Sequence, residues 1–426
     1  MNKSLSFAGR LQLIVSVISS MYSYWASVFV LPSATVKKLE RKIKGFLWQK
    51  DGKDRPKAKV AWRDVCLPKI EGGLGIRKIS DVNKALMSFH IWSIITRRKS
   101  LWVEWIYDHK LKGSSFWDVE PRVSMSWGWR KILQLRETIR PYIRQKIGDG
   151  KNTFIWSDNW CDQSPLSRII TPRDIYMAGF SRTDRVADMV VDRNWIWPAA
   201  WYDLFPVLIN IQVPFMSYSR RDVSIWLDYQ GGEREFSTHN VWETIRHRSM
   251  QIPWYNIVWF NGCIPRHAFH VWLVCRKKLN TQDKMKLWDM NMMCCPLCMR
   301  DLDSHAHLFF ECVYANQVWK EVRMFTDLEQ IEGHWENIVL FLLSRGKWNS
   351  SNTIIDRLVI GATSYYIWQE RNARLFTSTK RSPKQISALI LDNVRMKLVS
   401  LRKKKVFANW RTRKGWDLEQ FEDNDG

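Results

Sequence analysis

The chain has 426 residues, 46% of them hydrophobic, and its 66 lysines and arginines exceed 42 aspartates and glutamates, leaving a net charge of +24. The hydrophobic content excludes a disordered chain, and the length allows two or three domains with their own cores. The charge excludes an ordinary balanced surface. It favours a polyanionic partner, nucleic acid first and anionic membrane second.

Tryptophan and cysteine are both used unusually. Most of the 26 tryptophans are predicted to fill helix-packed cores, although some could stack on bases. Four of the eight cysteines lie within the 19 residues from Cys294 to Cys312, whereas the others are scattered. A secreted disulfide framework would spread its pairs over a smaller chain. The pattern therefore predicts an intracellular protein with one local metal site, and it leaves the nucleus open as its location.

The first predicted helix covers residues 5–31 and has no charged residue from Leu11 to Pro32, a length that could cross a bilayer. A polar stripe nevertheless runs along one side, opposite an apolar stripe, which favours a helix whose apolar side is buried in protein. Neither a membrane span nor a signal peptide is expected. The polar stripe is Gln12, Ser16, Ser19, Ser20, Ser23 and Ser27, and the apolar stripe is Leu13, Val17, Tyr24 and Val28.

Further helices are predicted at residues 34–48, with Ser33 as the N-cap, and at about 80–97 and 99–110. Between them, Glu71-Gly72-Gly73-Leu74-Gly75 is interpreted as a turn. It lacks the Lys-Ser/Thr ending of a phosphate-binding loop, and no convincing strand precedes it.

The organisation loosens between residues 111 and 235. Ile147-Gly148-Asp149-Gly150-Lys151 is typical of a hairpin turn and is expected to lead into a short strand at Thr153–Ser157. From 160 to 235, short apolar segments alternate with Pro, Ser and Arg, which indicates a poorly packed linker. The sequence therefore predicts a mainly α fold with a small β element near 147–160.

Helical patterns return after residue 236. Ser237 is expected to begin a helix to about 248, and Thr281 to cap one to about 289. An acidic tail at 417–425 should be disordered. The other predicted helices cover 266–278, 313–326, 334–345, 352–376 and 383–405.

The cysteine cluster has the spacing of a zinc knuckle. Cys295-Pro-Leu-Cys298 is followed after eight residues by His307, and Cys312 lies five residues further on. Four sulfur or imidazole ligands suit tetrahedral Zn²⁺, and a site with no open position is structural. Cys294 in place of Cys295, His305 in place of His307, or buried thiols without metal remain alternatives.

Basic residues flank this cluster and predict a phosphate-binding face of strong salt dependence and little sequence preference, the alternative being a merely solvated surface. The predicted nucleic-acid-binding residues are Arg276, Lys277, Lys278, Lys284 and Lys286 before the cluster, Arg300 inside it, and Arg402, Lys403, Lys404 and Lys405 after it.

Several segments, in this order, resemble one family. The chain is similar to the C-terminal part of plant non-LTR (LINE-type) retrotransposon reverse transcriptases, which ends in the reverse transcriptase zinc-binding domain. The segments are Ser6-Phe7-Ala8-Gly9-Arg10-Leu11-Gln12-Leu13-Ile14, Lys59-Val60-Ala61-Trp62, Gly72-Gly73-Leu74-Gly75-Ile76, Ile147-Gly148-Asp149-Gly150-Lys151, Trp156-Ser157-Asp158-Asn159-Trp160, the cysteine cluster and Tyr366-Ile367-Trp368-Gln369-Glu370-Arg371-Asn372.

The resemblance implies four regions. Residues 1–110 would be a thumb-like helical region following a missing polymerase palm, and 111–235 an irregular linker with a short hairpin. Residues 236–325 would be the zinc-binding domain, and 326–426 a basic helical region with an acidic tail.

The chain departs from the family in the groups that carry catalysis. It contains no Asp-Asp pair, and paired carboxylates are what the family's polymerase core uses to hold two metal ions. The ribonuclease H carboxylates are also missing, so no catalytic residue is expected. The expected function is nucleic-acid binding, RNA or DNA, without a small-molecule substrate. The alternatives are part of a split polymerase completed by another chain, a zinc-scaffolded protein-interaction module, or a decayed reading frame.

Overall fold

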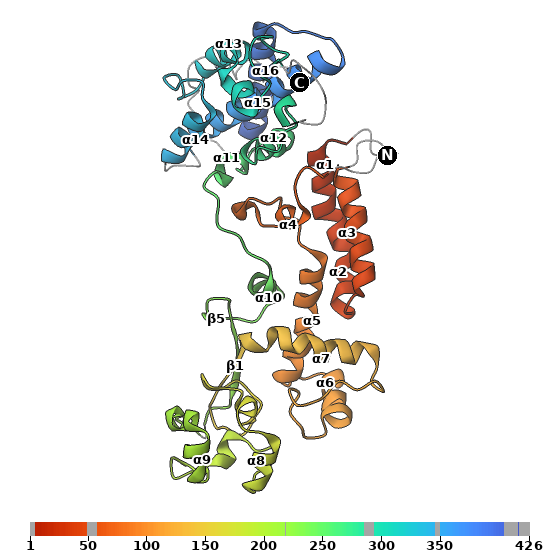
Figure 1. The fold of residues 1–426 in the computed structure, drawn as a ribbon, viewed down its shortest axis with the longest axis vertical. Coiled ribbons are helices and arrows are strands. Elements are labelled where there is room, and N and C mark those ends of the chain that lie inside the picture. Colours follow the sequence, from red (N-terminus) through yellow and green to blue (C-terminus); the bar gives the residue numbers. More distant parts are fainter. Residues whose placement is uncertain are drawn as a thin grey trace. The chain divides into compact units, whose positions relative to one another are not determined.

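A computed structural model describes residues 5–48, 58–217, 219–284, 294–345, 350–403 and 416. Over these residues the chain forms mostly helices, with a few short strands (Figure 1). The predicted fold class, mainly α with a small β element, is confirmed. Contacts divide the chain into two compact units, each assembled from segments distant in sequence. The predicted regions, with boundaries at 110, 235 and 325, are instead consecutive stretches of sequence. That these regions are domains stays a prediction.

Unit 1 consists of Met1–Ile18, Arg41–Ile76 and Arg248–Gly426. α12 packs against α1 and α15, and α16 packs against α13 and α15, around the buried Trp272 and Trp319. The helices of this unit are α1 (Phe7–Leu13), the second part of α3 (Ser33–Trp48), α4 (Trp62–Val65), α11 (Tyr255–Val258), α12 (Pro265–Cys275), α13 (Val313–Arg323), α14 (Trp335–Ser344), α15 (Ser351–Phe376) and α16 (Pro383–Lys403).

Unit 2 consists of Ser19–Glu40 and Arg77–His247. Its helices are α2 (Ser19–Val28), the first part of α3, α5 (Ile79–Ile95), α6 (Leu101–Ile106), α7 (Trp127–Ile139), α8 (Pro172–Met177), α9 (Ala200–Leu204) and α10 (Thr238–Ile245). Its strands are β1 (Ile143–Lys146), β2 (Val190–Val191), β3 (Asn194–Trp195), β4 (Val223–Leu227) and β5 (Glu233–Arg234).

The centre of unit 2 is α5, against which α2, α7 and α10 pack. An antiparallel sheet of order β1-β4-β5 lies beside this core, with Ile143 opposite the fully buried Trp226. The strand predicted at Thr153–Ser157 is wrong. Only an isolated bridge between Phe154 and Arg185 forms there, and the strands lie before and after it.

The turn at Gly148 and Gly150 binds a carboxylate and does not form a hairpin. Asp222 accepts hydrogen bonds from the amides of Gly148 at 2.7 Å, Gly150 at 2.9 Å and Asn152 at 3.0 Å, and from the Thr153 hydroxyl at 2.8 Å. A Cβ at position 148 would lie 2.4 Å from the Arg221 carbonyl oxygen, so only glycine permits this approach. The motif therefore joins two segments more than 60 residues apart in sequence.

Residues 160–211 are packed, which corrects the expectation of a poorly packed linker. Trp156, Trp160, Trp197 and Trp201 are buried in one cluster, and Trp156 meets the rings of Trp197 and Trp201 at 6.1 Å. The hydrophobic periodicity of the sequence does not predict this core, because the segment has few long helices. Its apolar residues meet across turns and not along one helix face. The prediction also missed the helix α7, which lies earlier in the region 111–235 that was expected to be irregular.

The N-terminal helix does not bury the predicted apolar stripe. Leu13, Val17, Tyr24 and Val28 are between 37% and 67% exposed, whereas Ala26 is buried. On the predicted polar stripe, Gln12, Ser16 and Ser20 are exposed, and Ser19, Ser23 and Ser27 are half-buried. The serine hydroxyls can bond to the helix's own carbonyls, as Ser23 does to Ser19 at 2.6 Å.

The side chain of Asn83 on α5 fixes the end of α2. Its amide donates to the carbonyls of Ala26 and Phe29, each at 2.7 Å, and its oxygen accepts from the Leu31 amide at 2.8 Å. By length and composition alone, Phe7–Val28 qualifies as a membrane-crossing helix, with 22% of its apolar window buried. That it does not cross one stays a prediction.

The remaining helix predictions agree with the structure to within a few residues. α3 begins at Ser33 itself, and Ser237 caps α10 by accepting from Asn240 N at 3.1 Å. Thr281 does not cap a helix; a single 3-10 turn at Gln282–Lys284 follows it. The rest of the helix predicted to 289, and the acidic tail at 417–425, lie outside the described residues.

In unit 1 the Gly72-Gly73 turn docks on α12. The Gly72 carbonyl accepts hydrogen bonds from Trp272 Nε1 at 2.8 Å and Arg276 Nε at 2.9 Å. A Cβ at position 73 would lie 1.8 Å from the Leu67 carbonyl oxygen, which excludes any other residue. The glycines are therefore structural, as their lack of a phosphate-loop ending indicated, and they tie the N-terminal segment to the helix preceding the cysteine cluster.

Replacement of Asp222 by alanine should destabilise unit 2 and remove part of its pH dependence. Partial burial by itself raises the pKa of this carboxyl, but the Gly148 and Gly150 amides outweigh that effect and lower the pKa below its ordinary value. The contribution to stability is therefore present above the unfolded pKa and lost as pH falls through the lower folded value, below about 4. Denaturant unfolding should show a loss of about 1–3 kcal/mol at neutral pH, since four donors lose their acceptor.

The control is Asp203→Ala, which removes an exposed carboxylate on α9. Equal stability changes for the two variants at pH 7 would contradict the assigned role of Asp222.

Candidate metal centre

Cys295 and Cys298 are presented by a tight turn. Cys294 forms a β-bridge with Leu302, which closes the loop. Within it, Cys295 N donates to the Asp301 carbonyl at 2.7 Å, and Met299 N donates to the Cys295 carbonyl at 2.7 Å. Met299 adopts a left-handed φ of 57°. The backbone N–H groups of Leu297 and Cys298 point at the Cys295 sulfur, as they do in a knuckle that holds a thiolate.

His307 and Cys312 come from the segment after this loop. The Ser304 hydroxyl accepts from His307 N at 3.2 Å, and a π turn, His307–Glu311, ends where Cys312 N donates to the His307 carbonyl at 2.7 Å. Cys312 is the N-cap residue of α13, which places its sulfur at the N-terminus of that helix. The partial positive charge of a helix N-terminus favours a thiolate at this position.

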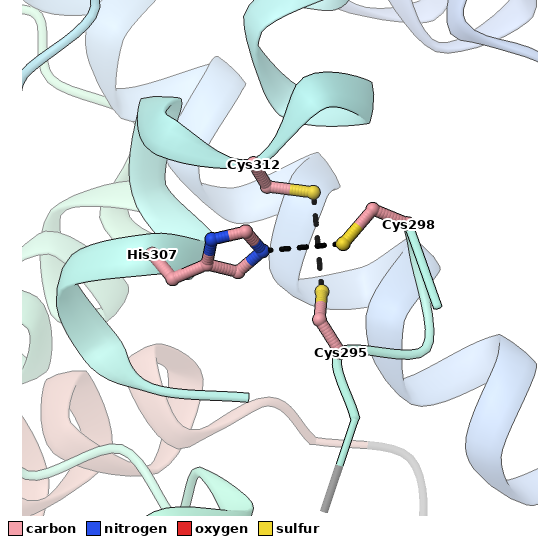
Figure 2. A group of neighbouring side chains, drawn as sticks. All are labelled: Cys295, Cys298, His307 and Cys312. Atoms are coloured by element: carbon pink, nitrogen blue, oxygen red, sulfur yellow. Dashed lines mark hydrogen bonds between the residues drawn. The ribbon is translucent and has the colours of Figure 1, made fainter. Parts of the chain in front are cut away.

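The four side chains converge on one point (Figure 2). Cys298 Sγ lies 3.3 Å from His307 Nε2, and Cys295 Sγ lies 3.9 Å from Cys312 Sγ. All four ligand atoms lie within 4.8 Å of one another. A tetrahedron with Zn–S bonds of about 2.3 Å has sulfur–sulfur edges of about 3.8 Å. A disulfide would need about 2.05 Å, so the separation matches a shared metal and not a covalent bond.

The ionisation of the two buried thiols also favours a shared metal ion. Cys295 and Cys312 are fully buried, and their contact lowers the pKa of Cys295 to about 5 while it raises that of Cys312. Without a cation, one sulfur is a thiolate and the other keeps its proton. A divalent ion allows both to ionise, because its charge offsets their repulsion and their burial. The cluster fits one zinc ion, and because the protein supplies all four ligands the ion is structural.

The other ring nitrogen of His307 faces a carboxylate. Nδ1 lies 3.8 Å from Asp301 Oδ2, and Asp301 is mostly exposed. A carboxylate on this side favours the tautomer that leaves Nε2 free to bind metal.

The long helix α15 holds the knuckle from one side. Arg374 donates from Nη1 to the carbonyls of Leu297 at 3.0 Å and Pro296 at 3.3 Å, so its guanidinium satisfies two backbone oxygens between the first two ligands. Glu370 positions this arginine with a hydrogen bond of 2.9 Å to Nε. Glu370 also accepts from the backbone and side chain of Arg381. These contacts outweigh its burial and lower the pKa of Glu370.

A buried ion pair ties the same helix to the loop between the ligand pairs. Asp303 and Arg371 are 0% and 1% exposed, and Arg371 Nη2 donates to Asp303 Oδ2. The same oxygen accepts from Gln282 N at 2.9 Å. Glu370-Arg371 belongs to the motif predicted to follow the cluster, so that motif has a structural role. Arg374 and Asp303 were missed; the spacing of Glu370 and Arg374 at i and i+4 was the available signal.

The two alternative ligands lie outside the cluster. Cys294 takes part in the bridge to Leu302, and His305 packs its ring 5.2 Å from that of Phe309. Burial lowers the pKa of His305 to about 4. The structure therefore brings together Cys295, Cys298, His307 and Cys312, the four residues predicted first.

The predicted basic residues divide into two groups. Arg276 is engaged in the protein, donating to Gly72 and lying 3.8 Å from Asp64, and Lys284 donates to the carbonyls of Lys277 and Leu279. Lys277, Lys278 and Arg300 are exposed. Lys286, Lys404 and Lys405 lie outside the described residues, and of Arg402 and Lys403 only the α16 backbone is described.

Comparison with known proteins agrees with this geometry. Residues 236–319 match the family described as zinc-binding in reverse transcriptase, so a domain of this type is present and contains all four ligands. A curated protein of Arabidopsis thaliana, whose name provisionally describes it as a ribonuclease H protein, is 28% identical over 339 residues, covering 75% of this chain and 53% of the relative. The chain thus spans about half the length of that relative. Together the two findings support a retrotransposon-related origin.

The metal site is tested by matched pairs of variants. The purified protein should contain about one zinc per chain by elemental analysis, because the four ligands form one tetrahedral site. Cys295→Ser and His307→Gln should lose that zinc together with part of the helical circular dichroism, since metal binding is coupled to folding. Cys294→Ser and His305→Gln should keep it. Zinc retained in Cys295→Ser and lost in Cys294→Ser would reassign the ligand.

Proposed function

We propose that this chain is a non-catalytic nucleic-acid-binding protein, related to the C-terminal region of a LINE-type retrotransposon reverse transcriptase, in which the zinc knuckle holds basic residues against an RNA or DNA strand. A zinc-binding reverse transcriptase domain in a chain of net charge +24 supports this proposal. The proposal includes an intracellular location, because free zinc-binding thiols suit a compartment in which thiols stay reduced.

The placement of the cations near the knuckle carries the proposal. Lys277 and Lys278 follow α12 directly and are exposed, and Arg300 is exposed within the ligand loop itself. Among the described residues, none of the three has a carboxylate within ion-pairing distance. Exposed cations without partners are available to phosphates, and they release counterions when they bind them.

The zinc gives these cations a fixed position. The loop between the ligand pairs contacts the segment after α12, because the Asp303 side chain accepts from Gln282 N at 2.9 Å and its carbonyl accepts from Asp283 N at 3.3 Å. In that segment, Lys284 donates to the Leu279 carbonyl at 3.3 Å. The basic segment after α12 is therefore joined to the ligand loop, and loss of the metal should disturb it. Phosphate contacts of this kind position a strand without reading its sequence.

The salt dependence of binding tests the electrostatic contribution. Affinity for a labelled 20-nucleotide RNA should fall steeply between low and moderate salt, with a slope of about −0.7 per phosphate neutralised on single strands. Lys277→Gln/Lys278→Gln should weaken binding about tenfold and reduce the slope by about one to two, measured by fluorescence anisotropy.

Lys37→Gln/Lys38→Gln is the matched control, since these two lysines are adjacent and exposed on α3. If binding does not respond to salt, or if both double variants lose affinity equally, the interface at the knuckle is refuted.

A polymerase assay separates this proposal from its main alternative, in which the chain completes a split RNA-directed DNA polymerase. No carboxylate pair of the catalytic type occurs in the sequence. Primer extension on an RNA template by the purified chain with Mg²⁺ should therefore give no product, and extension would overturn the non-catalytic assignment. A further alternative, a zinc-scaffolded protein-interaction module, would be favoured by affinity capture of one protein after nuclease treatment together with no binding to RNA.

A further inference from the structure

A second candidate site lies in unit 2, where a cavity of about 310 Å³ opens beside the Trp156–Trp160 segment. Neither this segment nor β1, which borders the same cavity, takes part in the zinc site. Its lining includes three arginines and one asparagine, which are Arg140, Arg144, Arg168 and Asn159.

Arg140 is a buried cation without a counter-ion. It is 8% exposed, its guanidinium lies 4.9 Å from the Trp117 ring, and Nη2 donates to the Ser157 carbonyl at 2.5 Å. Its Nε is buried and, among the residues that the structure describes, has no hydrogen-bond partner. Within the described part of the chain, no carboxylate lies within 4.0 Å of it. A buried charge in this state is unfavourable, and an anion entering the cavity would compensate it.

Two further arginines line the same cavity. Arg168 is exposed and forms no ion pair among the residues that the structure covers, and its charge lies near enough to Arg140 to lower the pKa of that guanidinium further. Arg144 pairs with the exposed Asp162 at 2.9 Å. Three guanidinium groups thus face one carboxylate. Planar guanidinium groups bind the oxygens of a phosphate or a carboxylate in bidentate geometry, so this cavity suits an oxyanion such as phosphate.

Asn159 supplies a hydrogen-bond acceptor beside these cationic donors. Its side-chain nitrogen donates to the carbonyls of Arg140 at 2.7 Å and Ile143 at 3.2 Å, which determines the orientation of the amide. Among the described residues the side-chain oxygen is then buried without a hydrogen-bond partner. A buried acceptor is normally satisfied, and a hydroxyl or amino group of a ligand would satisfy this one.

We propose that this cavity binds one nucleotide, whose phosphate contacts Arg140 and Arg168 and whose sugar hydroxyl or base amino group donates to Asn159. The volume lies at the lower end of the range of small-ligand sites, about 300–1,000 Å³. The proposal deepens the nucleic-acid-binding function and rests on it. The nucleotide can come from two sources, as a free monophosphate or as one unit of a strand.

The experiment uses the full-length chain with three probes, which are uridine 5′-monophosphate, inorganic phosphate and the labelled 20-nucleotide RNA. Calorimetry measures the first two and anisotropy the third. The variant is Arg168→Gln, because Arg168 is exposed and its loss should not unfold the unit, as loss of the buried Arg140 could. The matched control is Arg173→Gln, an exposed arginine on α8 outside the cavity.

We expect Arg168→Gln to weaken binding of the monophosphate, the RNA or both about tenfold, and Arg173→Gln to change neither by more than about twofold. Loss confined to the monophosphate identifies a free nucleotide as the ligand, and loss confined to the RNA identifies a strand. The nucleotide proposal is overturned if Arg168→Gln and Arg173→Gln behave alike with both probes, or if inorganic phosphate binds as tightly as the monophosphate. Failure of the proposed function is distinct, because wild-type protein would then not bind the RNA at all.

Discussion

In unit 1, three sulfurs and one imidazole nitrogen lie within 4.8 Å of one another. The packing of the ligand loop depends on the metal ion that these four groups can share. Cys295 and Cys312 are fully buried and cannot both be thiolates at 3.9 Å unless a cation lies between them. The ligand loop is short and has few apolar side chains of its own, so metal binding and folding are coupled there. Zinc serves in this protein as a structural cross-link between the loop and the N-terminus of α13.

The neighbouring helices bind the backbone and side chains of the ligand loop. α15 supplies Arg374 to the carbonyls within the knuckle and Arg371 to the buried Asp303, so one helix contacts both halves of the ligand loop. α12 binds the Gly72 carbonyl through Trp272, and its His270 ring lies 6.1 Å from that of Phe309 in the ligand segment. α12 therefore links an N-terminal stretch of unit 1 to the segment that carries His307 and Cys312.

Arginine has two contrasting roles in the molecule. Arg371 and Arg374 are buried against carboxylates, and such pairs specify geometry because either partner alone would be an uncompensated charge. Arg140 is also buried, but among the described residues no carboxylate lies within 4.0 Å of it, and the one carboxylate that lines its cavity, Asp162, pairs with Arg144. In a chain with an excess of 24 positive charges, internal carboxylates neutralise only some of the cations. The sites where they do not are the positions at which we propose that phosphate binds.

The local features of this protein were determined by sequence alone. The four ligands were readable from their spacing, and most helices from their apolar periodicity, because both signals arise between residues within one or two turns of each other. The structural role of Gly72 and Gly73 was likewise indicated by the absence of a phosphate-loop ending.

Only the tertiary structure decided the rest. It placed Asn83 of α5 against the Ala26 carbonyl at the end of α2, showed that Gly148 and Gly150 bind Asp222 without forming a hairpin, and packed the tryptophans of residues 156–201 into a core. It also separated Arg276, which is engaged inside the protein, from Lys277, which is exposed. Each of these outcomes depends on which distant residue supplies the partner, and spacing along the chain carries no information about contacts made across many tens of residues.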